Sequence, residues 1–169
     1  MNMFIYESRV EIRADRETVW PLLCGATMTL PPPLLLRLGV PRPVGCRLAD
    51  DGRTRECITD RGRVEQRILE RRAPERLAFE RVRDTAGLER WVRSMKDTFT
   101  LEPLEDGTRL TRRTEIEPRA CAAPFLCLAL AVIHRYVNRN FKRLAERVSP
   151  ARPEAPRTAP PRPGDRRST

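Results

Sequence analysis

Residues 90–102 place charged side chains among apolar ones on one face of a predicted strand. Because side chains alternate between the two faces of a strand, one face carries Trp91, Arg93, Met95, Asp97, Phe99 and Leu101. If this aromatic face points inward, Arg93 and Asp97 point inward with it, and a buried charge is costly unless it is paired or functional. Two interpretations stay open. The charges either anchor a ligand oxygen or carboxylate, or sit at a cavity rim or in a cross-strand pair.

Arg112 extends this group of charges. It shares a strand face with Leu110, Thr114 and Ile116, so it can point the same way. Arg93 and Asp97 are four residues apart on one strand, roughly 13 Å, and cannot pair directly.

No catalytic constellation accompanies these charges, so the catalytic residues stay unknown. The chain has no G-x-S-x-G, glycine-rich phosphate loop or H-E-x-x-H motif, and we expect no cofactor. Its single histidine, His134, falls with Asn138 and Lys142 off the apolar stripe of a predicted helix. We expect it to be partly exposed or to cap a neighbouring group, with a general-base role as the alternative.

Metal binding is not favoured either. The five cysteines include no C-x-x-C pair, and one histidine is too few for an ordinary zinc site. We interpret the cysteines as small buried hydrophobes in a reducing compartment.

The net charge of +10 raises the question of nucleic acid. The positive charge is almost all arginine, however, and is spread along the chain among 23 acidic residues. We interpret it as a solvated surface and expect no nucleic-acid partner. The N-terminus lacks the basic-then-apolar order of a signal peptide, and no apolar run reaches the ~18 residues of a membrane span. A cytoplasmic location is the default expectation.

Residues 4–13 alternate apolar and polar side chains, which predicts a strand with one dry face. Asp15 then follows as a good N-cap for a short helix that carries Val19, Trp20, Leu22 and Leu23. A leucine cluster within residues 28–43, bounded by prolines and a glycine, predicts a second short helix.

Six further strands are predicted between residues 45 and 118. Asp51-Gly52 and Asp106-Gly107 are hairpin signals, and residues 60–62 and 73–75 are turns of a similar kind. The strand-length segments between them are residues 46–49, 53–59, 63–70, 76–82, 90–102 and 108–117. Connections this short require an antiparallel meander.

A long helix is predicted from Pro118 to about Val148, apolar all round in its first half and amphipathic in its second. Residues 150–169 are rich in proline and arginine and cannot bury enough apolar surface to order themselves. The chain therefore divides into one domain, residues 1–149, and a disordered tail, residues 150–169.

The order of these α+β elements resembles the helix-grip fold of the START-like, or SRPBCC, superfamily. There a curved antiparallel sheet, here of seven strands with two short helices after the first, wraps a long C-terminal helix. Residues 10–20, with Glu17, Val19 and Trp20, resemble the family's opening. Residues 62–68 and 74–80 resemble its central hairpin, and residues 99–103 and 107–111 its last one. The similarity is greatest to the bacterial polyketide cyclase/dehydrase and lipid-transport group.

This resemblance implies an apolar cavity between the sheet and the long helix that binds a hydrophobic small molecule such as a lipid or polyketide. The alternative is a polyketide cyclase or aromatase acting on a ligand in the same cavity. A third hypothesis is transient contact with a membrane surface through residues 34–38 and the start of the long helix. Oligomeric state stays open. The candidate ligand-binding residues are Phe79, Trp91, Arg93, Met95, Asp97, Phe99, Arg112, Leu126, Leu130 and Ile133.

Overall fold

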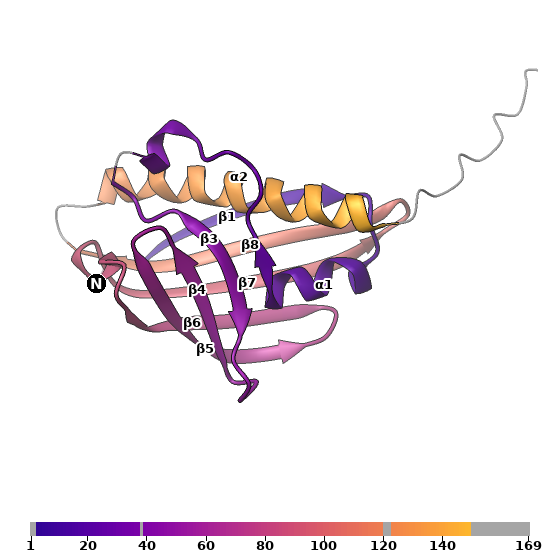
Figure 1. The fold of residues 1–169 in the computed structure, drawn as a ribbon, viewed down its shortest axis with the longest axis horizontal. Coiled ribbons are helices and arrows are strands. Elements are labelled where there is room, and N and C mark those ends of the chain that lie inside the picture. The colour runs from indigo at the N-terminus through magenta and orange to yellow at the C-terminus, as the bar shows by residue number, and fades with distance from the viewer. Residues whose placement is uncertain (1–2, 38, 120–122, 150–169) are drawn as a thin grey trace, which may run out of the picture.

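A computed structural model describes residues 3–37, 39–119 and 123–149, which form one curled antiparallel sheet and a long helix (Figure 1). The sheet order is β1-β8-β7-β6-β5-β4-β3-β2, and every neighbouring pair is antiparallel. The strands are β1 (Phe4–Ile12), β2 (Ala26–Thr27), β3 (Pro43–Leu48), β4 (Thr54–Thr59), β5 (Gly62–Arg72), β6 (Arg76–Asp84), β7 (Val92–Leu104) and β8 (Gly107–Pro118).

The predicted meander is confirmed, with one strand more than expected. The additional strand is the two-residue β2, which pairs with Cys46 and Gly45 of β3. A glycine is needed in that pair because a Cβ at Gly45 would lie 2.9 Å from the carbonyl oxygen of Ala26. A sequence pattern does not reveal a strand of two residues, since alternation needs at least four.

Three helices were predicted; one has the expected form, and two differ from the prediction. Helix α1 (Arg16–Cys24) is capped as expected, because the Asp15 carboxylate accepts a hydrogen bond from the Thr18 N–H at 2.7 Å. The predicted second helix is a single 3₁₀ turn, η1 (Leu34–Arg37). Pro118 does not open the long helix: it ends β8, and helix α2 spans Ala123–Val148.

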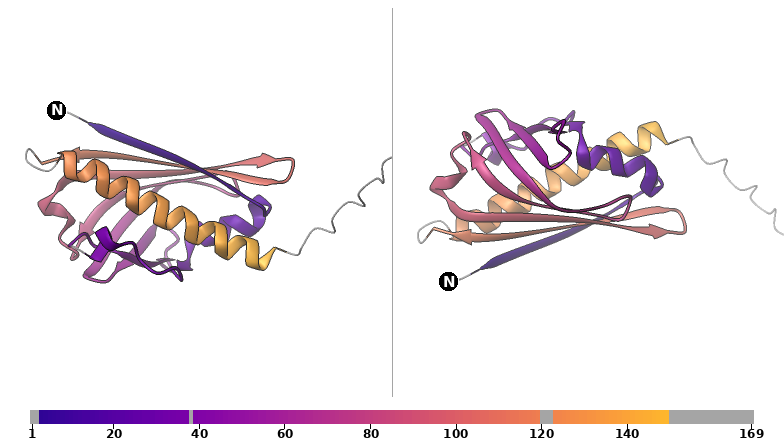
Figure 2. Two further views of the ribbon diagram at one scale, coloured as in Figure 1. Left: turned by 90° about the horizontal axis from the view of Figure 1, so that it is seen from above. Right: turned by 90° about the horizontal axis from the view of Figure 1, so that it is seen from below.

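Helix α2 lies across the concave face of the sheet, seen from two further sides in Figure 2. The core between these layers joins apolar side chains of α2, of α1 and of the inner sheet face. Among its fully buried members are Ile12, Val19, Leu23, Leu77, Phe79, Phe99, Leu110, Phe141 and Ala145.

Two polar clusters fix the loops that flank α2 and the sheet. The Asn140 side-chain oxygen accepts hydrogen bonds from the Thr29 and Leu30 N–H groups at 2.7 and 2.9 Å, which holds this segment against the helix. The Asp84 carboxylate accepts bonds from the Gly87 and Leu88 N–H groups and pairs with Arg81. These bonds place the short turn η2 (Leu88–Arg90) beside the start of β7.

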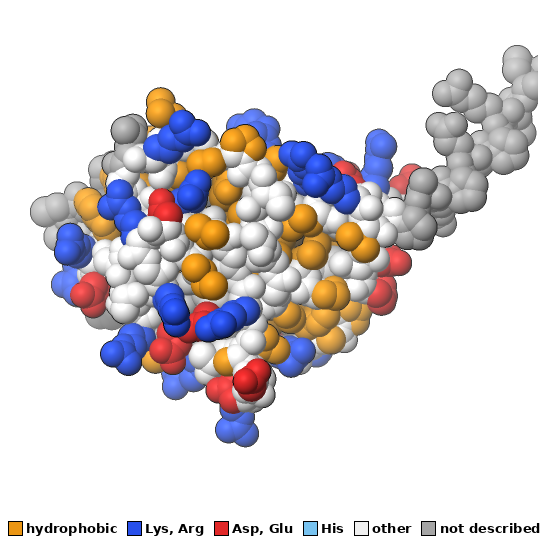
Figure 3. All heavy atoms as spheres, viewed as in Figure 1, with side chains coloured by type: hydrophobic (Ala, Val, Ile, Leu, Met, Phe, Trp, Pro, Cys, Tyr) orange, Lys and Arg blue, Asp and Glu red, His pale blue; other side chains and the backbone are white. Residues whose placement is uncertain are grey.

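On the face shown in Figure 3, lysine and arginine side chains are scattered, with acidic and apolar groups between them. No helix in the described ranges is long and apolar enough to cross a membrane. The predicted tail of residues 150–169 lies outside the described residues.

Candidate functional site

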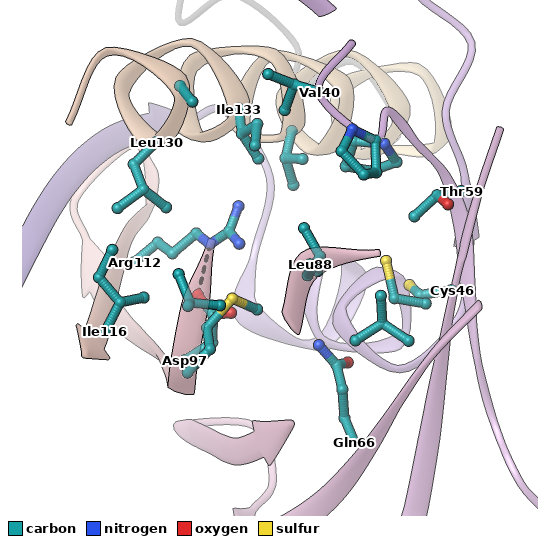
Figure 4. A pocket seen from close by; sticks show the side chains of 18 of the residues that line it. Val40, Cys46, Thr59, Gln66, Leu88, Asp97, Arg112, Ile116, Leu130 and Ile133 are labelled. Carbon is teal, nitrogen blue, oxygen red and sulfur yellow. Dashed lines mark hydrogen bonds and ion pairs between the residues drawn. The ribbon is translucent and has the colours of Figure 1, made fainter. Parts of the chain in front are cut away.

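A cavity of about 220 Å³ lies between the concave sheet face and α2 (Figure 4). For comparison, pockets that hold drug-sized ligands measure roughly 300–1,000 Å³. Strands β3 to β8 and α2 contribute to its wall, together with residues 39–41 and Leu88. Its apolar lining includes Met28, Val40, Val64, Phe79, Val92, Met95, Phe99, Ile116, Leu126, Ala129, Leu130, Ile133, Val137 and Phe141.

The structure places nine of the ten candidate residues in this wall. Strand alternation turns Met95, Asp97 and Phe99 inward, and the apolar half of α2 supplies Leu126, Leu130 and Ile133. Trp91 lies at the end of η2 rather than in a strand. Its side chain is 40% exposed and packs on Phe125 with the ring centroids 5.6 Å apart.

Arg93 is the tenth candidate, and its expected inward position is wrong. A bulge between Val92 and Ser94 reverses the alternation, so Val92 is buried and Arg93 points outward. The Arg93 guanidinium lies 3.4 Å from Glu117 with its side chain 59% exposed. The bulge is stabilised by Arg81, whose Nη2 donates to the carbonyl oxygens of both Val92 and Arg93.

Asp97 and Arg112 form a buried ion pair in the cavity wall. The Nε of Arg112 donates to Oδ1 of Asp97 at 3.0 Å, and the two side chains are 10% and 1% exposed. Burial alone would raise the pKa of the Asp97 carboxyl. The Arg112 charge and the hydrogen bonds from Thr114 and Arg112 outweigh burial and hold that pKa below its usual value, so Asp97 is ionised.

His134 is fully buried, not partly exposed as the helix pattern suggested. Its Nε2 lies 2.7 Å from the Thr114 hydroxyl, its Nδ1 lies 2.7 Å from the Ser8 hydroxyl, and its ring contacts Tyr6 edge-on. An ionised Asp97 can only accept, so Thr114 donates to it and accepts from His134 Nε2–H. In the neutral imidazole, Nδ1 then accepts from the Ser8 hydroxyl.

The pKa of His134 agrees with this proton arrangement. Burial and the Arg112 charge lower it to about 3, although Asp97 favours the charged form. Ser8 in turn accepts a hydrogen bond from Asn138 at 3.0 Å. Because its two ring nitrogens are occupied by hydroxyl partners, His134 acts as a structural member of a polar chain that ends at Asp97.

Arg55 is a cavity residue that the sequence analysis missed. It lies on β4, is 5% exposed, and its guanidinium stands over the Phe79 ring at 4.5 Å. Its Nε donates to the Leu23 carbonyl oxygen at 3.0 Å, and its Nη1 donates to the Gln66 side-chain oxygen. Strand alternation could have indicated this position, because Arg55 and Cys57 share a face of the predicted strand. An arginine within RTRECIT, however, resembles a solvent-facing residue.

Two thiols also line the cavity, Cys46 and Cys57, which are partners across β3 and β4. Burial raises the pKa of the Cys57 thiol, which therefore stays protonated near neutral pH. Cys46 is buried as expected, whereas Cys24, Cys57 and Cys127 are free cysteines that are only partly buried as whole residues. Cys121 lies outside the described residues. No group of metal-binding side chains occurs within the ranges that the structure describes.

The model of the polyketide cyclase/dehydrase and lipid transport family matches residues 3–149. The chain belongs to this family. The match covers the sheet, the cavity wall and all of α2, and the resemblance noted from the sequence is thereby confirmed.

Solved structures agree on the fold. A START superfamily protein from Mycobacterium smegmatis is 13% identical with a TM-score of 0.63, and the match covers 86% of this chain and 99% of that one. A Chromobacterium violaceum protein is 21% identical with a TM-score of 0.57, covering 84% and 96%. Ginseng major latex-like protein 151 from Panax ginseng is 13% identical with a TM-score of 0.54, covering 81% and 96%. No curated protein matches the sequence.

Proposed function

We propose that the protein binds a hydrophobic small molecule in the cavity between the sheet and α2. The observation that carries this proposal is the cavity itself: about 220 Å³ of space bounded mainly by aliphatic and aromatic side chains. Protein interiors are normally packed without voids of this size, so a space lined in this way is suited to an apolar guest. Membership of a family whose description includes lipid transport supports the proposal.

Binding is favoured over a cyclase activity by the state of the cavity's polar groups. Asp97 is the one carboxylate among the described lining residues, and its Oδ1 accepts hydrogen bonds from Arg112 and Thr114. Its Oδ2 is buried without a hydrogen-bond partner among the described residues. Its lowered pKa makes it a weak base, whereas a general base works best with a pKa near the operating pH.

A fluorescent apolar probe, N-phenyl-1-naphthylamine, tests the proposal. Ala129 is buried on the cavity side of α2, so Ala129→Phe should fill the space and abolish the fluorescence gain. Its neighbour Leu128 is 55% exposed, so Leu128→Phe is the matched control and should bind the probe like the parent chain.

The melting temperature of Ala129→Phe supplies a second readout. A ring placed in a real cavity leaves stability nearly unchanged, whereas overpacking a filled core costs about 1–3 kcal/mol. Absence of probe binding by the folded parent chain, or equal binding by both phenylalanine variants, would contradict the proposal.

A further inference from the structure

The cavity holds a positive charge that no described acidic side chain balances. Arg55 is 5% exposed, and both of its hydrogen-bond partners, the Leu23 carbonyl and the Gln66 side chain, are neutral. It forms no ion pair with any described residue. Contact with the Phe79 ring offsets only part of what a guanidinium loses on leaving water.

The second guanidinium in the wall has unused donors. Arg112 extends from β8 toward the middle of the cavity, and its Nε is bonded to Asp97 (Figure 4). Its Nη1 is buried without a hydrogen-bond partner among the described residues. The Arg112 side chain is nine-tenths buried, and leaving one of its N–H donors without a partner costs free energy unless a ligand or a water molecule accepts that hydrogen bond.

The charges of the wall add up to one excess positive charge. Arg55 and Arg112 are cations, Asp97 is an anion, and the remaining titratable groups are the thiols of Cys46 and Cys57. The nearby His134 is neutral. The Gln66 amide also points into the cavity (Figure 4). One negative charge on a guest would therefore neutralise the site.

We propose that the ligand is an amphipathic acid: an apolar chain or ring system that carries a single carboxylate. Arg55 balances its charge, Arg112 offers its free N–H donors, and the aromatic and aliphatic wall encloses the rest. A guanidinium suits this role because it stays charged in an apolar site and presents paired donors that match a carboxylate. This inference rests on the proposed function and narrows its ligand class.

Two probes with the same ten-carbon chain, decanoate and decan-1-ol, separate the effect of charge from that of hydrophobicity. Each is titrated into the full-length protein by calorimetry near pH 7.5. Decanoate should bind roughly tenfold or more tightly than the alcohol, the range for a charged hydrogen bond. Arg55→Met should remove this preference by weakening decanoate alone. Arg93→Met is the matched control, because Arg93 is an exposed arginine outside the wall, and it should keep the preference.

The double variant Asp97→Asn/Arg112→Met removes the second guanidinium without leaving a buried carboxylate, so the test does not depend on Arg55→Met folding. It should also weaken decanoate and spare decan-1-ol. Equal or tighter binding of decan-1-ol by the parent chain would overturn the inference while leaving the proposed function intact. So would an unchanged preference in both a folded Arg55→Met and the double variant. Failure of the parent chain to bind either probe would count against the proposed function itself.

Discussion

Arg112 reaches Asp97 diagonally across two strands. In the register of β7 and β8, Asp97 faces Thr114 and Arg112 faces Phe99, yet the Arg112 Nε lies 3.0 Å from the Asp97 carboxylate. The guanidinium passes the Phe99 ring with its carbon 5.3 Å from the ring centroid. A diagonal contact of this kind suits a long side chain, and it places an ion pair in a wall made mainly of apolar side chains.

Breaking this pair should destabilise the protein far more than removing both partners. Arg112→Met leaves the Asp97 charge buried and unpaired, and we expect it to cost about 3–5 kcal/mol of unfolding free energy. Asp97→Asn/Arg112→Met removes the charges together and should recover most of that loss. Urea unfolding of the two variants measures the difference. A single variant within about 1 kcal/mol of the parent would show that the pair contributes little.

Acid should weaken the fold through His134. Its pKa in the folded protein is about 3, below the ordinary value of 6.5, so folding favours the neutral ring. The stabilisation is complete above pH 6.5 and is lost as the pH falls from 6.5 toward 3. Between pH 7.5 and pH 5 the loss should be roughly 2 kcal/mol, at 1.36 kcal/mol per pH unit.

The control for this prediction is His134→Gln, whose side chain does not titrate. Between pH 7.5 and pH 5, the unfolding free energy of this variant should fall by roughly 2 kcal/mol less than that of the parent chain. A pH dependence identical to that of the parent chain would mean that His134 does not set the response.

The register of the last hairpin could be predicted from the sequence, because its turn lies between Leu104 and Gly107 and the pairing holds without a shift back to Asp97. That register already sets Asp97 opposite Thr114 and near Arg112. The outward turn of Arg93 could not be predicted, because the bulge is held by a side chain of the neighbouring strand β6, Arg81, and strand alternation does not report such a contact.

The burial of His134 on α2 could not be predicted from the sequence either. A helical wheel separates His134 from the apolar stripe, yet α2 lies across the concave face of the sheet and His134 is fully buried there. The partners that make its burial tolerable, Ser8 and Thr114, come from β1 and β8. Amphipathic periodicity predicts a single buried face. It therefore does not predict the burial of polar residues on a helix that is covered on more than one side.

Asn140 should prove to be a structural residue despite its polarity. It is fully buried, and its side-chain oxygen accepts both the Thr29 and Leu30 N–H groups. Asn140→Ala leaves these donors without that acceptor and should cost about 2–3 kcal/mol. The exposed neighbour Arg139 provides the control, since Arg139→Ala should change stability by less than about 0.5 kcal/mol. Equal effects of the two substitutions in thermal or urea unfolding would reject this role.

Replacement of Arg81 by methionine should lower stability far more than replacement of Arg93. Among the described residues, the Arg93 side chain forms an ion pair with Glu117 alone and is 59% exposed, so Arg93→Met should change stability by less than about 0.5 kcal/mol. The Arg81 side chain is 9% exposed, pairs with the fully buried Asp84, and donates to the carbonyls of the bulge. Arg81→Met leaves the Asp84 carboxylate without its cationic partner and those carbonyls without their donor, and should cost about 3 kcal/mol or more.

The same pair of variants tests the link between the bulge and the cavity. Val92 reaches the cavity wall because the chain reverses its alternation beside Arg81. In urea unfolding and in titration with N-phenyl-1-naphthylamine, Arg81→Met should therefore lose both stability and probe affinity, and Arg93→Met neither. If Arg93→Met instead weakened binding of the neutral probe, its side chain would have to turn inward in solution, and the bulge would not fix the register that the cavity depends on.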